Sequence, residues 1–167
     1  MTEERTTSAA SGPAPRTSAA TETADGLSPS KLSFAREPNL KAREVAVEIA
    51  RVLHDDKCSD IVVLDVTGLS HVSDYLVIGS GTSDRQMQSA GADAGQAAAK
   101  LGYNAYRRST DDRTTWVLVD CVDVVVHIFE PNTRAHYDLE MLWGDAPRIE
   151  WERPDQVSRD RAGLGKG

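Results

Sequence analysis

Apolar side chains recur every three or four residues in three stretches of the chain, and this period predicts helices. The first helix is expected over residues 40–54, with Asn39 as its N-cap. The second begins after a capping box at residues 83–86 and continues with small apolar residues to Gly102. A third helix is expected over residues 132–143.

Between the helices, short β-branched runs bounded by turn residues predict strands. Five such runs are present, at residues 60–66, 73–81, 103–107, 116–120 and 123–130. The last two runs are so close together that an antiparallel hairpin is expected there. The resulting order, αββαβββα, mixes hairpins with crossover connections. It predicts an α+β or mixed α/β sandwich.

The two ends of the chain lack this patterning. Residues 1–36 are dominated by Ser, Thr, Ala, Pro and Gly, and such a segment cannot bury enough surface to offset its conformational entropy. Its large apolar side chains are only Leu27, Leu32 and Phe34. Its acidic and basic residues balance, unlike those of an acid-poor organellar presequence. We therefore expect a disordered tail over residues 1–36, one domain over residues 37–151, and a flexible tail over residues 152–167.

Composition and charge disfavour a nucleic-acid-binding or membrane-spanning protein. The 167 residues are 40% hydrophobic and 27% charged, with a formal net charge of -7. The first tail is neutral and residues 152–167 carry +1, so residues 37–151 carry -8. This acidity disfavours non-specific nucleic-acid binding, which needs Lys and Arg on phosphates. No apolar stretch approaches the roughly 18 residues of a membrane span. Two cysteines without zinc-site spacing fit a reducing cytoplasm.

A Gly-rich turn at residues 79–83 joins an expected strand to an expected helix, where backbone amides can hold an anion. It lacks the Walker and G-x-G-x-x-G spacings, so a simple tight turn is favoured. A nucleotidyltransferase that used such a turn would also need two carboxylates one residue apart on a strand, to bind magnesium. Asp120 and Asp123 are three apart, and Asp111 and Asp112 are adjacent. A nucleotidyltransferase-like enzyme using residues 79–83 stays an alternative that lacks its metal site.

The other chemically reactive residues do not form a catalytic set. The four histidines are scattered without zinc-site spacing, and His127 lies in an apolar strand, where a structural role is favoured. Cys58 and Cys121 have no adjacent base, and no G-x-S-x-G elbow is present. The sequence therefore predicts no enzyme, no cofactor and no metal site.

Aromatic residues concentrate in the second half of the domain. Trp116 opens a strand, where one ring face is expected to meet solvent, and Tyr137 and Trp143 lie in the last expected helix. Leu139 and Leu142 fit core packing. Because Trp and Tyr are enriched at interface hot spots, the three aromatic residues are candidate anchors. On an acidic domain they favour a basic protein partner.

Four sequence strings occur in one order: LDVTGLSHVSDYLVIGSGTSDRQ (64–86), WVLVD (116–120), DVVVHIF (123–129) and RAHYDLEMLWGDAP (134–147). Together they resemble the ribosomal silencing factor family, also called Iojap-like or RsfS. The resemblance spans roughly residues 40–148 and leaves out both tails. It implies a nucleotidyltransferase-like fold without the catalytic carboxylates.

The resemblance also implies a function. Members of the family bind the large ribosomal subunit through its L-series protein fourteen, block subunit joining, and so repress translation when nutrients are scarce. They are cytoplasmic in bacteria and often homodimers when free, and in organelles they are linked to large-subunit assembly. For this chain the resemblance implies a cytoplasmic translation repressor, with a large-subunit assembly factor as an alternative.

Carried over residue by residue, the resemblance marks candidate positions for partner binding. Trp116 is the expected anchor, and its replacement by alanine is expected to weaken ribosome binding without unfolding the domain. The other candidates are Asp74, Tyr75, Thr82, Ser83, Glu130, Arg134, Tyr137 and Trp143. Because the attraction to a basic partner is partly electrostatic, salt is expected to weaken the complex.

Overall fold

Five strands form one mixed sheet in the computed structural model, which describes residues 37–104 and 107–156. The strands are β1 (Ser59–Asp65), β2 (Tyr75–Ser80), β3 (Arg107–Thr110), β4 (Trp116–Asp120) and β5 (Val124–Phe129). Their order across the sheet is β1-β2-β5-β4-β3. β2 and β5 pair in parallel, whereas the other neighbours are antiparallel. The antiparallel β4–β5 pair confirms the expected hairpin.

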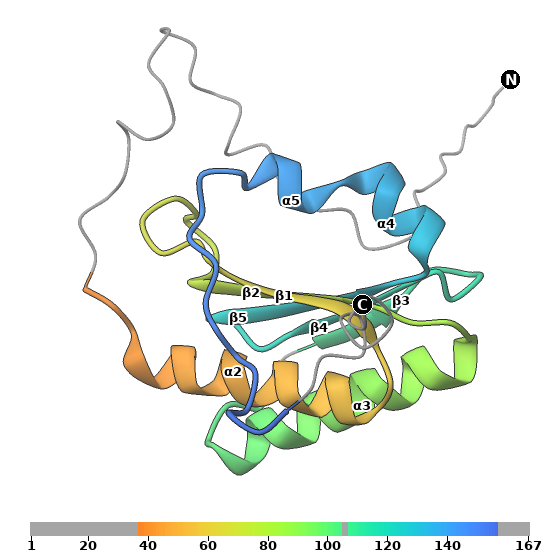
Figure 1. The fold of residues 1–167 in the computed structure, drawn as a ribbon, viewed down its shortest axis with the longest axis horizontal. Coiled ribbons are helices and arrows are strands. Elements are labelled where there is room, and N and C mark those ends of the chain that lie inside the picture. The colour runs from red at the N-terminus through yellow and green to blue at the C-terminus, as the bar shows by residue number, and fades with distance from the viewer. Residues whose placement is uncertain (1–36, 105–106, 157–167) are drawn as a thin grey trace, which may run out of the picture.

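Helices cover both faces of this sheet (Figure 1). α2 (Leu40–Asp55) and α3 (Asp84–Lys100) lie side by side on one face. α4 (Pro131–Tyr137) and α5 (Leu139–Leu142) lie over the other face. The arrangement has three layers, and it confirms the expected mixed α/β class.

The larger core fills the space between the sheet and the helix pair α2–α3. α2 starts at Asn39, whose side chain accepts a hydrogen bond from the backbone N–H of Ala42 at 3.0 Å, as expected for its N-cap. The apolar faces of the two helices are buried, and they include Val45, Ala46, Ile49, Leu53, Met87, Ala90, Ala94 and Ala98. Because α3 contributes mostly small side chains, it packs close to the sheet.

Glycines within α3 predict a close approach to a neighbouring element, and the structure confirms this at Gly91. A methyl group added there would lie 2.9 Å from Cγ1 of Val117 on β4. Gly91→Ala is expected to lower the free energy of unfolding by about 1 kcal/mol, because overpacking outweighs the gain in helix propensity. Urea unfolding measures the change against Ser89→Ala, at an exposed position of α3. A more stable Gly91→Ala chain would contradict the close contact.

A second core lies between the sheet and the helices α4 and α5. Its buried residues are Val62, Leu64, Val66, Leu76, Ile78, Trp116, Phe129, Leu139 and Ala146. Because both faces of the sheet are covered, every residue of the interior strand β2 is buried. This explains why β2 is a continuous apolar run without polar alternation.

The third strand and the last helix differ from the sequence-based prediction. β3 begins at Arg107, where the expected strand ended, because the backbone N–H of Tyr103 donates to Ala98 O at 2.8 Å and closes the end of α3. The single helix expected over residues 132–143 is broken at Asp138, whose φ of 46° and ψ of 54° are left-handed. A right-handed helix cannot continue through that conformation, so two short helices form.

The domain is expected to end at residue 151, but the chain after α5 still contacts the domain beyond that residue. Residues 147–149 pair with the outer edge of β1. Further on, Arg153 donates to both carboxylate oxygens of Asp55 at 3.0 Å. The first residues of the expected C-terminal tail therefore contact α2. Residues 1–36 and 157–167, for which tails are expected, lie outside the described residues.

Candidate functional site

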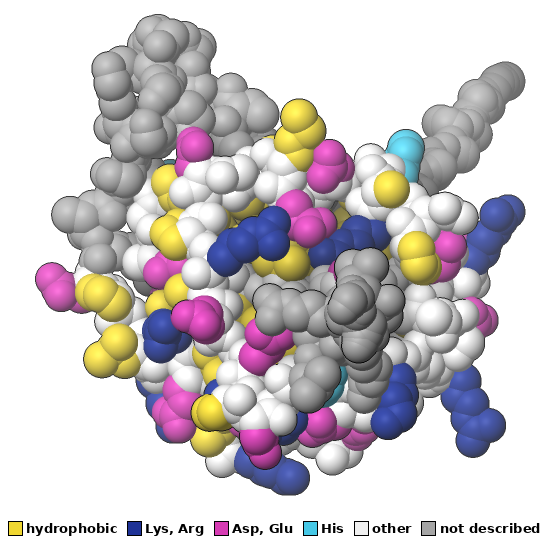
Figure 2. Space-filling model, viewed as in Figure 1, with side chains coloured by type: hydrophobic (Ala, Val, Ile, Leu, Met, Phe, Trp, Pro, Cys, Tyr) yellow, Lys and Arg dark blue, Asp and Glu magenta, His cyan; other side chains and the backbone are white. Residues whose placement is uncertain are grey.

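The helices α4 and α5 carry a row of exposed apolar side chains, which we call the α4–α5 ridge: Tyr137, Met141 and Leu142. Their exposed fractions are 43%, 77% and 40%. Figure 2 shows yellow side chains at the top of the molecule, where Figure 1 places these helices. Exposed apolar side chains gathered on two neighbouring short helices of a small domain are typical of an interaction surface.

Below the ridge, aromatic rings connect α4 to the sheet. Tyr137 packs over Trp116 with ring centroids 4.5 Å apart, and Trp116 lies 4.9 Å from Phe129. The indole Nε1 of Trp116 donates a hydrogen bond to Nδ1 of His127 at 3.2 Å. These contacts restrain Tyr137, so the ridge rests on an ordered base.

His127 is a buried, neutral acceptor in this cluster. Burial lowers its pKa from 6.5 to about 4, so the imidazole is uncharged at neutral pH. Its Nδ1 then has a free lone pair for the indole N–H of Trp116. This arrangement agrees with the structural role expected for His127.

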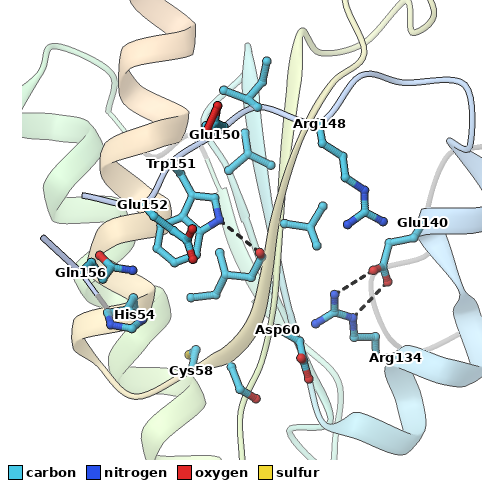
Figure 3. Close-up of a pocket in the computed structure, with 15 residues that line it drawn as sticks. His54, Cys58, Asp60, Arg134, Glu140, Arg148, Glu150, Trp151, Glu152 and Gln156 are labelled. Atoms are coloured by element: carbon cyan, nitrogen blue, oxygen red, sulfur yellow. Dashed lines mark hydrogen bonds and ion pairs between the residues drawn. The ribbon is translucent and has the colours of Figure 1, made fainter. Parts of the chain in front are cut away.

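Glu130 and Arg134 fix the positions of the two helices. The carboxylate of Glu130 caps α4 by accepting from the N–H and the hydroxyl of Thr133 at 3.2 and 3.1 Å. Arg134 donates to both carboxylate oxygens of Glu140 at 3.1 and 2.9 Å (Figure 3). It also donates to the hydroxyl of Ser80 at 2.8 Å. These charge-assisted bonds join α4 to α5 and tie α4 to the end of β2.

A hollow of about 430 Å³ lies beside Tyr137, between α4 and the loop that precedes β4. In that loop, Asp111 accepts from the backbone N–H of Trp116 at 2.9 Å and from Thr115. Partial burial raises the pKa of Asp111, but the hydrogen bonds, first that of the Thr115 hydroxyl, bring it below its ordinary value. The hollow therefore has one wall made by an ordered loop, and the exposed Asp112 lines it.

A larger cavity of about 730 Å³ runs along the outer edge of β1 (Figure 3). Trp151 forms one wall, and its indole N–H donates to Ile61 O at 3.2 Å. The charged side chains that line the cavity are Asp60, Arg134, Glu140, Arg148, Glu150 and Glu152. Because acids outnumber arginines there, the cavity does not favour an anionic ligand such as a phosphate.

The structure corrects the prediction for Trp116. The residue is only 2% exposed, and Tyr137 packs over its ring, so the expectation that one ring face meets solvent is wrong. The expectation that Trp116→Ala leaves the fold intact also conflicts with this burial. Sequence alone did not show that Tyr137 would cover the strand that Trp116 opens.

Four of the other candidate residues divide between the two ends of β2, and a fifth follows α5. Thr82 and Ser83 are exposed just beyond its carboxyl end, near the start of α4. Asp74 and Tyr75 lie at its opposite end and are each 1% exposed. Trp143 is half-buried against the second core. The structure therefore brings Thr82 and Ser83 close to the beginning of α4, and it places Asp74 and Tyr75 away from it.

The turn at residues 79–83 already uses several of its backbone donors. The N–H of Thr82 donates to Gln86 Oε1 at 2.6 Å, and the N–H of Gly81 donates to β5 at 2.9 Å. The N–H of Gln86 donates to the Ser83 hydroxyl at 3.2 Å, which forms one half of the expected capping box. The other half differs, because Gln86 reaches Thr82 and not Ser83. These bonds favour a tight turn over a phosphate-binding loop.

Two residues of the ridge, Leu142 and Met141, could not be recognised from the sequence as exposed. Core packing is expected for Leu139 and Leu142. Leu139 is 3% exposed, as expected, but Leu142 is 40% exposed, so that prediction is wrong. The break at Asp138 starts a new helix and changes which positions face the sheet. Met141 has no functional signal either, because a lone methionine in an apolar helix usually fills a core.

Reactive and metal-binding groups are sparse in the described ranges. Residues 37–104 and 107–156 contain no group of three or more His, Cys, Asp or Glu side chains that could hold a metal ion. Cys58 and Cys121 are free and buried, and burial raises their pKa values to about 12 and about 11. They are therefore poor nucleophiles. No helix within the described residues has the length and hydrophobicity to cross a bilayer.

Together the fold and the site define a mixed α/β domain with an aromatic-supported apolar ridge on its last two helices. A family model described as "Ribosomal silencing factor during starvation" matches residues 39–164. The chain belongs to this family of ribosomal silencing factors, as the sequence motifs indicate.

Individual relatives agree with this assignment. The chain is 43% identical over 102 residues to Ribosomal silencing factor RsfS of Bacillus subtilis (strain 168), covering 60% of this chain and 86% of the relative. It is 31% identical over 102 residues to Mitochondrial assembly of ribosomal large subunit protein 1 of Mus musculus, covering 57% of this chain and 43% of that protein. A crystal structure of a Chromobacterium violaceum protein matches with a TM-score of 0.58 and 29% identity, covering 66% of this chain and 92% of that one.

Proposed function

We propose that this chain binds the large ribosomal subunit through its L-series protein fourteen and sterically blocks subunit joining, which represses translation when nutrients are limiting. Membership of the ribosomal silencing factor family supports the ribosome as the target. The single observation that supports a binding surface on this chain is the exposed α4–α5 ridge. In this mechanism the bound protein itself obstructs the joining of the subunits, and no catalysed reaction is required.

The ridge has the physical properties of a preformed anchor. Met141 is 77% exposed, and burying such a side chain contributes about 1.5–3 kcal/mol. The ring contact of Tyr137 and the Arg134–Glu140 ion pair hold α4 and α5 in place before any partner arrives. Binding therefore costs less ordering entropy than it would on a mobile segment.

The charges around the ridge favour a basic partner. Asp112 is exposed in the loop before β4, Asp138 between α4 and α5, and Asp145 in the turn after α5. These three acids outnumber the exposed Arg113 beside Asp112, and Arg134 is engaged by Glu140. Acidic residues around an apolar centre attract a basic ribosomal protein and repel the phosphates of bare RNA. Salt then weakens binding by screening the charges, while the apolar contacts keep part of the affinity.

Met141→Asp is expected to weaken binding to purified large subunits at least about tenfold, because it places a charge at the centre of the apolar contact. The fold should keep its thermal stability, since Met141 is 77% exposed. Cosedimentation with large subunits and with isolated protein fourteen measures the affinity. Light scattering of mixed subunits measures whether joining is restored.

Leu40→Asp is the matched control for this variant. Leu40 is 72% exposed and undergoes the same change of chemistry at the start of α2, away from the ridge. It should bind as the unchanged chain does. Equal losses for the two variants would indicate a general charge effect, and unchanged binding of Met141→Asp would place the contact elsewhere.

A second role, in assembly of the large subunit, is supported by the printed name of the mouse relative. The same ridge would serve both roles, so mutations in it do not separate them. In cells that lack the protein, accumulated large-subunit precursors would indicate assembly, and excess joined ribosomes during starvation would indicate silencing. The homodimeric state and the cytoplasmic location implied by the resemblance stay predictions.

A further inference from the structure

Three other exposed apolar side chains lie at one end of the sheet, and we call them the end patch: Leu40, Val72 and Val122. Their exposed fractions are 72%, 60% and 53%. They belong to the start of α2, the loop between β1 and β2, and the β4–β5 turn. Figure 2 shows yellow side chains along the left-hand edge, where Figure 1 places the start of α2 and that loop. A single exposed hydrophobic residue is ordinary, but three from separate segments at one end indicate a contact surface.

A polar network brings these three segments together. Nδ2 of Asn39 donates to the carboxylates of Asp74 and Asp123 at 3.2 and 3.3 Å. The backbone N–H of Asp74 also donates to Asp123 O at 2.8 Å. Each member of the end patch lies one or two residues along the chain from one of these three residues. The end patch is therefore held in place by the fold and does not depend on a loose loop.

Val122 occupies an unfavourable backbone conformation. Its φ is 75°, in the left-handed region that β-branched residues rarely adopt. Its N–H donates to the Asp120 carboxylate at 2.9 Å, which holds the turn. Asn or Gly would fit this turn with less strain. Val122 is therefore an exposed apolar side chain held in place by the turn, and it is available for a contact.

We infer that residues 27–36 of this same chain cover the end patch. This segment contains the large apolar side chains of the preceding sequence: Leu27, Leu32 and Phe34. Phe34 is six residues before Leu40, so the two are at most about 20 Å apart. A tether of this length gives an effective concentration in about the millimolar range, well above that of a free partner in dilute solution.

Charge complementarity supports the same occupant. Residues 27–36 contain Lys31 and Arg36 and no acidic residue. On the domain, the half-buried Asp120 and Asp123 flank Val122 in the sequence. Their carboxylates accept hydrogen bonds from the N–H of Val122 and from Asn39, and both keep their negative charge in these neutral contacts. The segment thus combines apolar side chains with cations, and the end patch combines apolar side chains with carboxylates.

The covering segment lies outside the part of the chain that the family model matches, and the contact is independent of the proposed ribosomal function. The family model begins to match at residue 39, after the segment has ended. The end patch comprises α2 and turn residues, whereas the ridge lies on α4 and α5. Its coverage would remove an apolar surface from solvent without occupying the ridge.

A nitroxide spin label at Ser33→Cys in the full chain tests the inference by nuclear magnetic resonance. The two native cysteines are buried with raised pKa values, so they should stay unlabelled. The oxidised label is expected to remove amide signal intensity at Val72 and Val122, with recovery on reduction. Arg113, in the loop at the other end of β4, should keep its intensity. Equal intensities at both ends of β4 would overturn the inference.

Two further measurements make the test specific. Val122→Asn suits a left-handed turn, so the labelled variant should keep its thermal stability, yet the signal at Val72 should recover because the apolar contact is lost. In a mixture of spin-labelled chains and isotope-labelled chains, no loss of signal is expected. Loss in that mixture would show that a second copy covers the end patch, and persistent loss in Val122→Asn would show that the apolar contact does not hold the segment. Either result would overturn the inference.

Discussion

Trp116→Ala is expected to lower the free energy of unfolding by about 4 kcal/mol, because a large buried ring is lost from the second core. The indole is 2% exposed and packs between Phe129 and Tyr137. Its removal leaves a cavity between the sheet and α4, and it leaves the buried acceptor of His127 without its donor. Denaturant unfolding followed by far-ultraviolet circular dichroism measures the loss independently of the missing tryptophan signal.

Trp116→Phe is the matched control. It keeps an aromatic ring against Tyr137 and removes the indole N–H, so a loss of only about 1 kcal/mol is expected. Because Tyr137 rests on Trp116, the alanine variant should weaken ribosome binding together with stability, and the phenylalanine variant should largely keep both. An alanine variant as stable as the unchanged chain would show that the indole does not support this core.

The regular elements could be predicted because their signals are local. The Asn39 cap and the apolar period of α2, and the β-branched runs of β4 and β5, each specify one element without reference to the rest of the chain. β3 could not be located, since its four residues are mostly exposed at a sheet edge and are strands only through pairing with β4. The break at Asp138 also lacks a local signal, and the arrangement of α4 after it includes a bond from Arg134 to the distant Ser80 of β2.

The sequence indicated the aromatic and acidic composition of the candidate site but only part of its geometry. The aromatic residues and the acidic character were evident from the sequence, and Tyr137 is exposed as a partner-binding residue must be. Burial of Trp116, Asp74 and Tyr75 depends on what packs over them, which no local pattern states. Motif positions common to a family include residues that build the fold as well as residues that touch a partner. Ribosome binding through the exposed positions therefore stays a prediction, which the variants of the ridge test.

Acidification below about pH 6.5 is expected to destabilise the domain through His127. Burial holds the pKa of His127 at about 4 in the folded chain, against 6.5 when it is exposed. Between these values the unfolded chain binds the extra proton, so stability falls as the pH falls. A difference of this size corresponds to about 3 kcal/mol, fully present above pH 6.5 and lost by about pH 4. Denaturant unfolding at a series of pH values measures it.

His127→Gln separates this proton from the carboxylates that also titrate in acid. Glutamine is neutral at every pH, and its side-chain oxygen can accept from the indole of Trp116 as Nδ1 does. The carboxylates contribute equally to both chains, so the difference between the two stability curves isolates the imidazole. The unchanged chain should lose about 3 kcal/mol relative to the variant between pH 7 and pH 4, whereas His136→Gln, at an exposed position of α4, should not remove that loss. Parallel curves for the unchanged chain and His127→Gln would mean that the imidazole takes up its proton without leaving the core, and the base beneath the ridge would then tolerate charge.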